Sequence, residues 1–171
     1  MLVASLIHDD FEDLEFWYPA MRLQEAGHTI HVLGERAGVT WHGKYGVPAE
    51  STHSFEDASP DAYDLLLVPG GWAPDKLRRY ASVLDLVRAF DRQGKIIGQI
   101  CHAGWVLASA GILRGRTVTS TPGIRDDLTN AGATWVDKPV VVDRNLVSSR
   151  RPPDLPAYGA ALVQAIDRRE R

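Results

Sequence analysis

An apolar, β-branched run at residues 96–100 leads directly into the only cysteine of the chain, Cys101, and constrains the fold more than any other stretch. Such a run is typical of a buried strand, and the small apolar residues from 103 to 111 predict a short helix. We therefore expect Cys101 at a turn from a strand into a helix. Unpaired N–H groups and the helix dipole favour a thiolate at such a turn, so the sequence predicts a lowered pKa for this thiol and a nucleophilic role.

Composition restricts the classes of protein to which the chain can belong. With 171 residues it is most simply one domain, spanning residues 1–171, and its 44% hydrophobic and 24% charged residues are typical of a folded globular protein. The net charge of −3, without a basic stripe, argues against nucleic acid as a partner.

No apolar run approaches the roughly 20 residues that cross a bilayer, and residues 1–7 lack a basic leader, so we expect no membrane partner. One cysteine forms no internal disulfide, and the expected location is the cytoplasm.

The rest of the chain alternates strands with helices. A strand at residues 2–8, a helix at 11–26 and a strand at 29–33 form a βαβ unit, which implies parallel strands. Further strands are expected at 64–68, 116–119, 134–136, 140–142 and 146–149, and further helices at 82–93, 123–131 and 153–169. Residues 38–51 predict a small hairpin at the sheet edge, and residues 69–75 a sharp loop. The fold class is α/β, with a mostly parallel central sheet and helices on both faces.

Three segments are expected to meet in one cleft, because ligands bind at the carboxyl ends of the strands in such sheets. These are the loops at residues 8–12 and 70–75 and the turn at Cys101. His102 is placed to move the thiol proton, provided that a strained turn brings the two neighbouring side chains together. Otherwise Cys101 is a small buried apolar residue, and His102 caps the helix or faces solvent.

Carboxylates near this cleft supply further candidates. Glu12 lies nearest to the end of the first strand, and in an apolar cleft its raised pKa lets the protonated form donate a hydrogen bond to the thiolate. The alternative is that Glu12 merely benefits from the helix dipole. Asp75 orients His102 or, alternatively, caps the turn that follows it. We expect no metal and no nucleotide cofactor, because the chain lacks the ligand spacings of metal sites and the lysine of a phosphate loop.

Five short segments of the chain resemble the DJ-1/PfpI superfamily, on its PfpI-type intracellular protease branch. They are residues 11–15 (FEDLE), 69–75 (PGGWAPD), 100–102 (ICH), 109–116 (SAGILRGR) and 122–127 (PGIRDD). The resemblance implies a flavodoxin-like three-layer sandwich, a domain of the class I glutamine amidotransferase-like type.

What the resemblance implies about the site goes further than the residues alone. Cys101 is the nucleophile on a strained elbow, and Glu12 is the protonated carboxyl that hydrogen-bonds it. The backbone N–H groups of Gly71 and His102 form an oxyanion hole. In PfpI-like members a glutamate from a neighbouring subunit reaches the histidine; here that position is Asp75, whose side chain is one methylene shorter. The resemblance also implies a homo-oligomer, a dimer or a larger assembly.

Several functions are compatible with these residues. The leading hypothesis is a cysteine-dependent stress enzyme with glyoxalase III-type or deglycase chemistry, acting on methylglyoxal or its adducts without a cofactor. The first alternative is a hydrolase of peptides, a PfpI-type intracellular cysteine peptidase. The second is a redox-sensing or chaperone stress protein in which Cys101 is oxidised.

Overall fold

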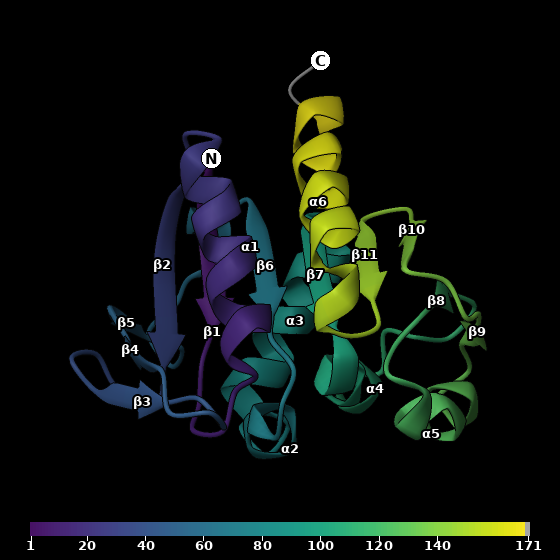
Figure 1. Cartoon of the computed structure of the whole chain (residues 1–171), viewed down its shortest axis with the longest axis horizontal. Coiled ribbons are helices and arrows are strands. Elements are labelled where there is room, and N and C mark those ends of the chain that lie inside the picture. The colour runs from purple at the N-terminus through teal and green to yellow at the C-terminus, as the bar shows by residue number, and fades with distance from the viewer. Residues whose placement is uncertain (170–171) are drawn as a thin grey trace.

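A central sheet organises the computed structural model, which describes residues 1–169 of the chain (Figure 1). Within those residues the sheet has seven strands in the order β10-β11-β7-β6-β1-β2-β5. Their bounds are β1 Leu2–Leu6, β2 Thr29–Gly34, β5 His53–Ser54, β6 Leu65–Val68, β7 Ile96–Ile100, β10 Val140–Asp143 and β11 Leu146–Ser149. Neighbouring strands are parallel except for β10 and β11, which are antiparallel. The predicted α/β class with a mostly parallel sheet is confirmed.

Helices cover both faces of the sheet, because the central strands are apolar on both sides. Along β6, Leu65 and Leu67 pack into one buried cluster while Leu66 and Val68 pack into the other. Helices α1 (Asp13–Glu25) and α6 (Leu155–Arg169) lie together in front of the sheet in Figure 1, and α3 (Ala81–Arg92) lies behind it. The remaining α-helices are α2 (Ala73–Leu77), α4 (Gly104–Ala110) and α5 (Arg125–Asn130).

Two pairs of short strands extend the architecture beside the main sheet. Strands β3 (Thr40–His42) and β4 (Pro48–Glu50) form the predicted hairpin, and β8 (Thr117–Val118) pairs in parallel with β9 (Thr134–Trp135). Short 3-10 turns occur at Pro60–Ala62, Cys101–Ala103, Pro122–Ile124 and Pro152–Asp154.

Two predicted element boundaries differ from the structure in ways that matter for the site. Helix α1 begins at Asp13 rather than Phe11, because the side chain of Glu12 caps it. The segment predicted as a loop contains α2, with Pro74 in its first turn. Proline fits there because its fixed φ is helical and its missing N–H leaves no bond unmade.

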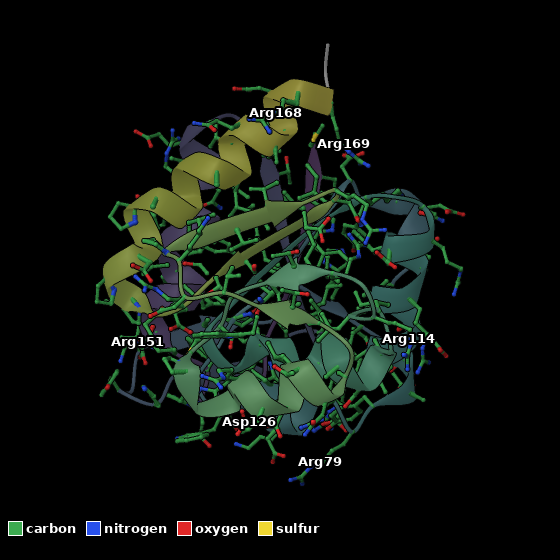
Figure 2. The ribbon with its side chains drawn as sticks, turned by 90° about the vertical axis from the view of Figure 1, so that its right-hand side faces the viewer. Arg79, Arg114, Asp126, Arg151, Arg168 and Arg169 are labelled. Atoms are coloured by element: carbon green, nitrogen blue, oxygen red, sulfur yellow. The ribbon has the colours of Figure 1, made fainter. Side chains whose placement is uncertain are left out.

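Charged side chains of both signs are spread over the surface. In Figure 2, Arg168 and Arg169 lie at the outer end of α6, whereas Arg79 and Asp126 lie at the opposite end of the molecule. No helix among residues 1–169 has the length and apolar composition needed to span a membrane.

Packing of α1 on the sheet can be tested at Leu23, which is fully buried on that helix. We expect Leu23→Ala to lower the free energy of unfolding by about 2–5 kcal/mol, because it leaves a cavity in the core. Its exposed neighbour provides a control: Gln24→Ala is expected to change that free energy by less than about 0.5 kcal/mol. Chemical denaturation measures both, and equal effects would contradict this account of the helix.

Candidate active site

Backbone contacts join the three segments that were predicted to meet. Strand β1 is followed by a segment in which Phe11 forms a β-bridge with Gly71, from the loop after β6. The N–H of Glu12 donates to the carbonyl oxygen of Gly70 over 3.1 Å, and that of Trp72 donates to Asp10 over 2.8 Å. Because β1, β6 and β7 are parallel neighbours, these segments and Cys101 share the carboxyl edge of the sheet.

Cys101 adopts a strained backbone conformation between β7 and α4. Its φ is 61°, in the left-handed region that residues other than glycine rarely adopt. Such strain costs about 1–3 kcal/mol and is typical of functional positions. The turn brings together two side chains that diverge in regular structure: Cys101 Sγ lies 3.2 Å from Nδ1 of His102. The structure thus places the predicted cysteine and histidine in direct contact.

The carboxyl beside the thiol belongs to Glu15, which corrects the prediction that it belongs to Glu12. One oxygen of Glu12 accepts a hydrogen bond from the backbone N–H of Glu15 over 2.8 Å and so caps α1. The carboxyl of Glu15 instead reaches the sulfur site. A Cβ placed on Gly70 would lie 2.1 Å from Oε2 of Glu15 and 2.6 Å from Cβ of Cys101, so both side chains flank that one point.

A sequence signal for Glu15 was available. Two carboxylates three residues apart at a helix start are typical of a cap, in which the first side chain accepts from the third backbone N–H. Once Glu12 is used in this way, Glu15 is the acidic residue left to face the neighbouring strand end.

Burial governs the protonation of Glu15. Glu15 is 2% exposed, and among residues 1–169 only the Cys101 thiol and the backbone N–H of Gly70 are near enough to its carboxyl to stabilise the charge by hydrogen bonding. Burial, together with the nearby charge of Glu12, raises the pKa of Glu15 to about 8. The carboxyl therefore holds its proton at neutral pH.

The Cys101 thiol shares this environment, and its pKa differs from the predicted lowered value. Burial and the charge of ionised Glu15 raise the pKa of Cys101 to about 12, although the N–H groups of His102 and Gly71 act in the opposite direction. The prediction from the sequence took account of the helix N-terminus, which lowers the thiol pKa, but not of burial. In the structure burial has the larger effect and raises the pKa. When Glu15 is protonated its repulsion of the thiolate disappears, so the two groups titrate as a coupled pair.

The position and the protonation state of His102 would allow its ring to accept a proton. Its ring lies between Trp72 and Trp105, with centroid distances of 5.0 Å to each. Burial and the charge of Lys44 lower the pKa of His102, so the imidazole is neutral at neutral pH. With Nδ1 unprotonated, the ring can accept a hydrogen bond from the Cys101 thiol.

The backbone N–H groups of Gly71 and His102 lie close enough to the Cys101 thiol to lower its pKa. Gly71 has φ of 76°, and a Cβ there would lie 2.4 Å from the carbonyl oxygen of Asp10. Only glycine fits at this position, because any side chain would push the N–H away from the sulfur. The oxyanion hole at Gly71 and His102 stays a prediction, and it needs both N–H groups to point to the place where the oxyanion forms.

Asp75 lies on α2 and forms an ion pair with Arg79, two residues beyond the end of that helix. Within the described part of this single chain, no hydrogen bond joins Asp75 to His102. Contact with the histidine of another subunit, and the homo-oligomer that it needs, stay predictions. Among residues 1–169, no group of three or more His, Cys, Asp or Glu side chains is arranged to hold a metal ion.

A family model, two relatives and a crystal structure are similar to this chain over nearly its whole length. The sequence model of the DJ-1/PfpI family matches residues 1–165. A deglycase from Pyrococcus abyssi is 44% identical over 166 residues, covering 97% of this chain and 99% of the relative. Protein/nucleic acid deglycase 2 of Escherichia coli is 42% identical, covering 96% of each chain. The crystal structure of Drosophila melanogaster DJ-1beta superposes with a TM-score of 0.88 at 29% identity, covering 94% of this chain and 87% of that one.

The buried carboxyl predicts a particular pH dependence of stability. Because folding raises the pKa of Glu15 from 4.5 to about 8, the folded state favours the protonated form, and stability is lost as the pH rises between these values. This loss amounts to roughly 3–4 kcal/mol between about pH 5 and pH 8. We expect Glu15→Gln to remove most of this loss, measured as the free energy of unfolding at several pH values.

The exposed Glu25 at the other end of α1 is the matched control. Glu25→Gln is expected to keep the pH dependence of the unaltered protein. A Glu15→Gln variant whose stability falls just as steeply would show that Glu15 is not the buried acid.

Proposed function

The chain belongs to the DJ-1/PfpI family, and from this premise we propose that it is a cysteine-dependent enzyme of carbonyl stress, converting methylglyoxal or removing its adducts. Relatives that are named deglycases, at 42–44% identity, support an enzymatic activity. The observation that carries the proposal is the contact between Cys101 and His102 beside the protonated carboxyl of Glu15. Nucleophile, base and acid are thus within one small site.

The first chemical step follows from the protonation states. Neutral His102 takes the thiol proton, and the sulfur of Cys101 attacks the aldehyde carbon of methylglyoxal. A carbon–sulfur bond forms while the carbonyl oxygen becomes an oxyanion, which the N–H groups of Gly71 and His102 stabilise. Glu15 or the protonated His102 then gives this oxygen a proton, and a hemithioacetal results.

The remaining steps return the enzyme to its starting state. A base moves the proton on the hemithioacetal carbon to the neighbouring carbon, which converts the hemithioacetal into a thioester of lactate. Water then cleaves the thioester, releasing lactate and restoring the thiol. One methylglyoxal and one water give one lactate, so no external oxidant or reductant is required. In this proposal the side chain of Glu15, placed over Gly70, is the protonated carboxyl beside the thiol that was first predicted to be Glu12.

The two alternatives, peptide hydrolysis and redox sensing, stay predictions. A redox-sensing cysteine needs an accessible thiol with a low pKa, because the thiolate is the form that peroxide oxidises. Cys101 is 8% exposed and burial raises its pKa, so this geometry favours sheltered chemistry on a small carbonyl.

Removal of either reacting side chain is expected to reduce lactate formation from methylglyoxal. Cys101→Ala is expected to lose the activity completely, and His102→Ala to lose roughly 10²–10⁴-fold in kcat, the usual contribution of a general base. Lactate is measured with purified protein, beside a parallel assay on a methylglyoxal-glycated amino acid. Undiminished lactate formation by Cys101→Ala would overturn the proposed function.

Gly70 provides a test of the geometry without removing a reacting group. A methyl group there would overlap Oε2 of Glu15 and Cβ of Cys101, so we expect Gly70→Ala to lower kcat/KM at least about tenfold. The control is Gly123→Ala, since a Cβ at Gly123 would meet no atom within 4 Å. If Gly70→Ala kept full activity while remaining folded, the carboxyl and the thiol would not need this close arrangement.

A further inference from the structure

The imidazole of His102 lacks, within this chain, the hydrogen-bonded partner that usually orients a catalytic base. Its Nδ1 lies 3.2 Å from the sulfur of Cys101, and no hydrogen bond to its Nε2 occurs within residues 1–169. Asp75, the carboxylate predicted to orient it, is paired with Arg79. A base that rotates away from its nucleophile is inefficient, because the alignment has to be regained before the proton can move. The contacts that hold this ring within the chain are aromatic.

Trp105 is the better held of the two tryptophans beside this ring. It follows His102 by three residues, a spacing that places side chains on the same side of a helix. The two rings are 5.0 Å apart at an angle of 56°, within the range of favourable aromatic pairs. Trp72 lies at the same distance on its own loop but is 53% exposed, whereas Trp105 is partly buried against the apolar core. Trp105 can therefore give the imidazole a fixed surface.

Side chains from neighbouring elements fix the indole of Trp105. Its Nε1–H donates to Oδ2 of Asp127 over 2.7 Å, from helix α5, which lies beside α4 in Figure 1. The guanidinium carbon of Arg78 lies 5.6 Å from its ring centroid, and Nε of Arg78 donates to Oγ of Ser109 over 2.8 Å. Asp127 ends the segment 122–127 that was noted in the sequence, for which the proposed reaction has no other use. A rotation of the indole would break these contacts.

We propose that Trp105, anchored by Asp127, is a positioning residue that acts through His102. Its indole keeps Nδ1 of the imidazole directed at the thiol of Cys101, which is the task of the hydrogen-bonded third group in a catalytic triad. This inference rests on the proposed function in one respect, the role of His102 as the base, and it does not depend on the identity of the substrate.

Alkylation of Cys101 by iodoacetamide tests the proposal without any turnover. The sulfur bonds to the reagent carbon and iodide leaves, and because the thiolate is the reacting form, the rate constant at neutral pH reports how well His102 removes the thiol proton. Intact-protein mass spectrometry measures this rate constant in the unaltered protein, Trp105→Leu, His102→Ala and the double variant. We expect Trp105→Leu to lower it about tenfold when His102 is present, and by less than about twofold in the His102→Ala background.

The comparison of the two backgrounds separates positioning from a merely structural role. Easier access to the sulfur after Trp105→Leu would change the rate constant by the same factor in both backgrounds and so cancels when the two factors are compared. If Trp105→Leu has the same effect with and without His102, the proposal is overturned.

The anchor can be tested at an exposed position, where folding is not at risk. Asp127→Ala removes the acceptor of the Trp105 Nε1–H and is expected to lower the alkylation rate constant roughly two- to fivefold, again only when His102 is present. The matched control is Asp126→Ala in the same helical turn, whose side chain is 91% exposed and which is expected to leave the rate constant unchanged. Equal effects of the two substitutions would contradict the anchoring role of Asp127.

Lactate formation distinguishes a failure of this proposal from a failure of the proposed function. If the unaltered protein makes no lactate while the effect of Trp105→Leu still depends on His102, the proposed function fails and the positioning role stands. If lactate forms but alkylation slows in Asp75→Asn and not in Trp105→Leu, a carboxylate orients the base and the positioning role of Trp105 is overturned.

Discussion

The thiol of Cys101 and the carboxyl of Glu15, both acidic groups, occupy one buried pocket over Gly70, and the surrounding structure holds them there. A glycine at 70 leaves the space in which they meet, and the cap formed by Glu12 sets the register of α1 so that Glu15 faces the sulfur. Two negative charges in such a pocket are unfavourable, so at least one proton remains on the pair at neutral pH. The chemistry of the site follows from where that proton is and what can remove it.

The neighbouring groups complete this arrangement at a cost in stability. A strained φ at Cys101 brings its sulfur to His102. Two tryptophans pack against the imidazole, and its partial burial lowers its pKa and favours the neutral form. The burial of Glu15 opposes its ionisation and so destabilises the folded state as the pH rises. Stability given up at a reactive site is common among enzymes, and here the large apolar clusters on both faces of the sheet compensate for it.

Sequence reasoning predicted the α/β class, the β3–β4 hairpin and the elbow at Cys101, since apolar runs and glycine positions are local signals. It did not predict which carboxyl meets the thiol, because a shift of the helix start from Phe11 to Asp13 changes which residue faces the strand end. Nor did it predict the raised pKa of Cys101, because burial depends on tertiary packing. Helix α2 was missed because prolines were interpreted as loop residues, although Pro74 fits a first helical turn.

The central claim is that Glu15 carries a proton beside Cys101 at neutral pH. Infrared difference spectroscopy tests it directly, because a protonated carboxyl group has a carbonyl stretch that a carboxylate lacks. Alkylating Cys101 is predicted to shift such a band in the unaltered protein and in Glu12→Gln, and to produce no such shift in Glu15→Gln. A band that survives in Glu15→Gln, or the absence of any protonated carboxyl near the sulfur, would contradict the account.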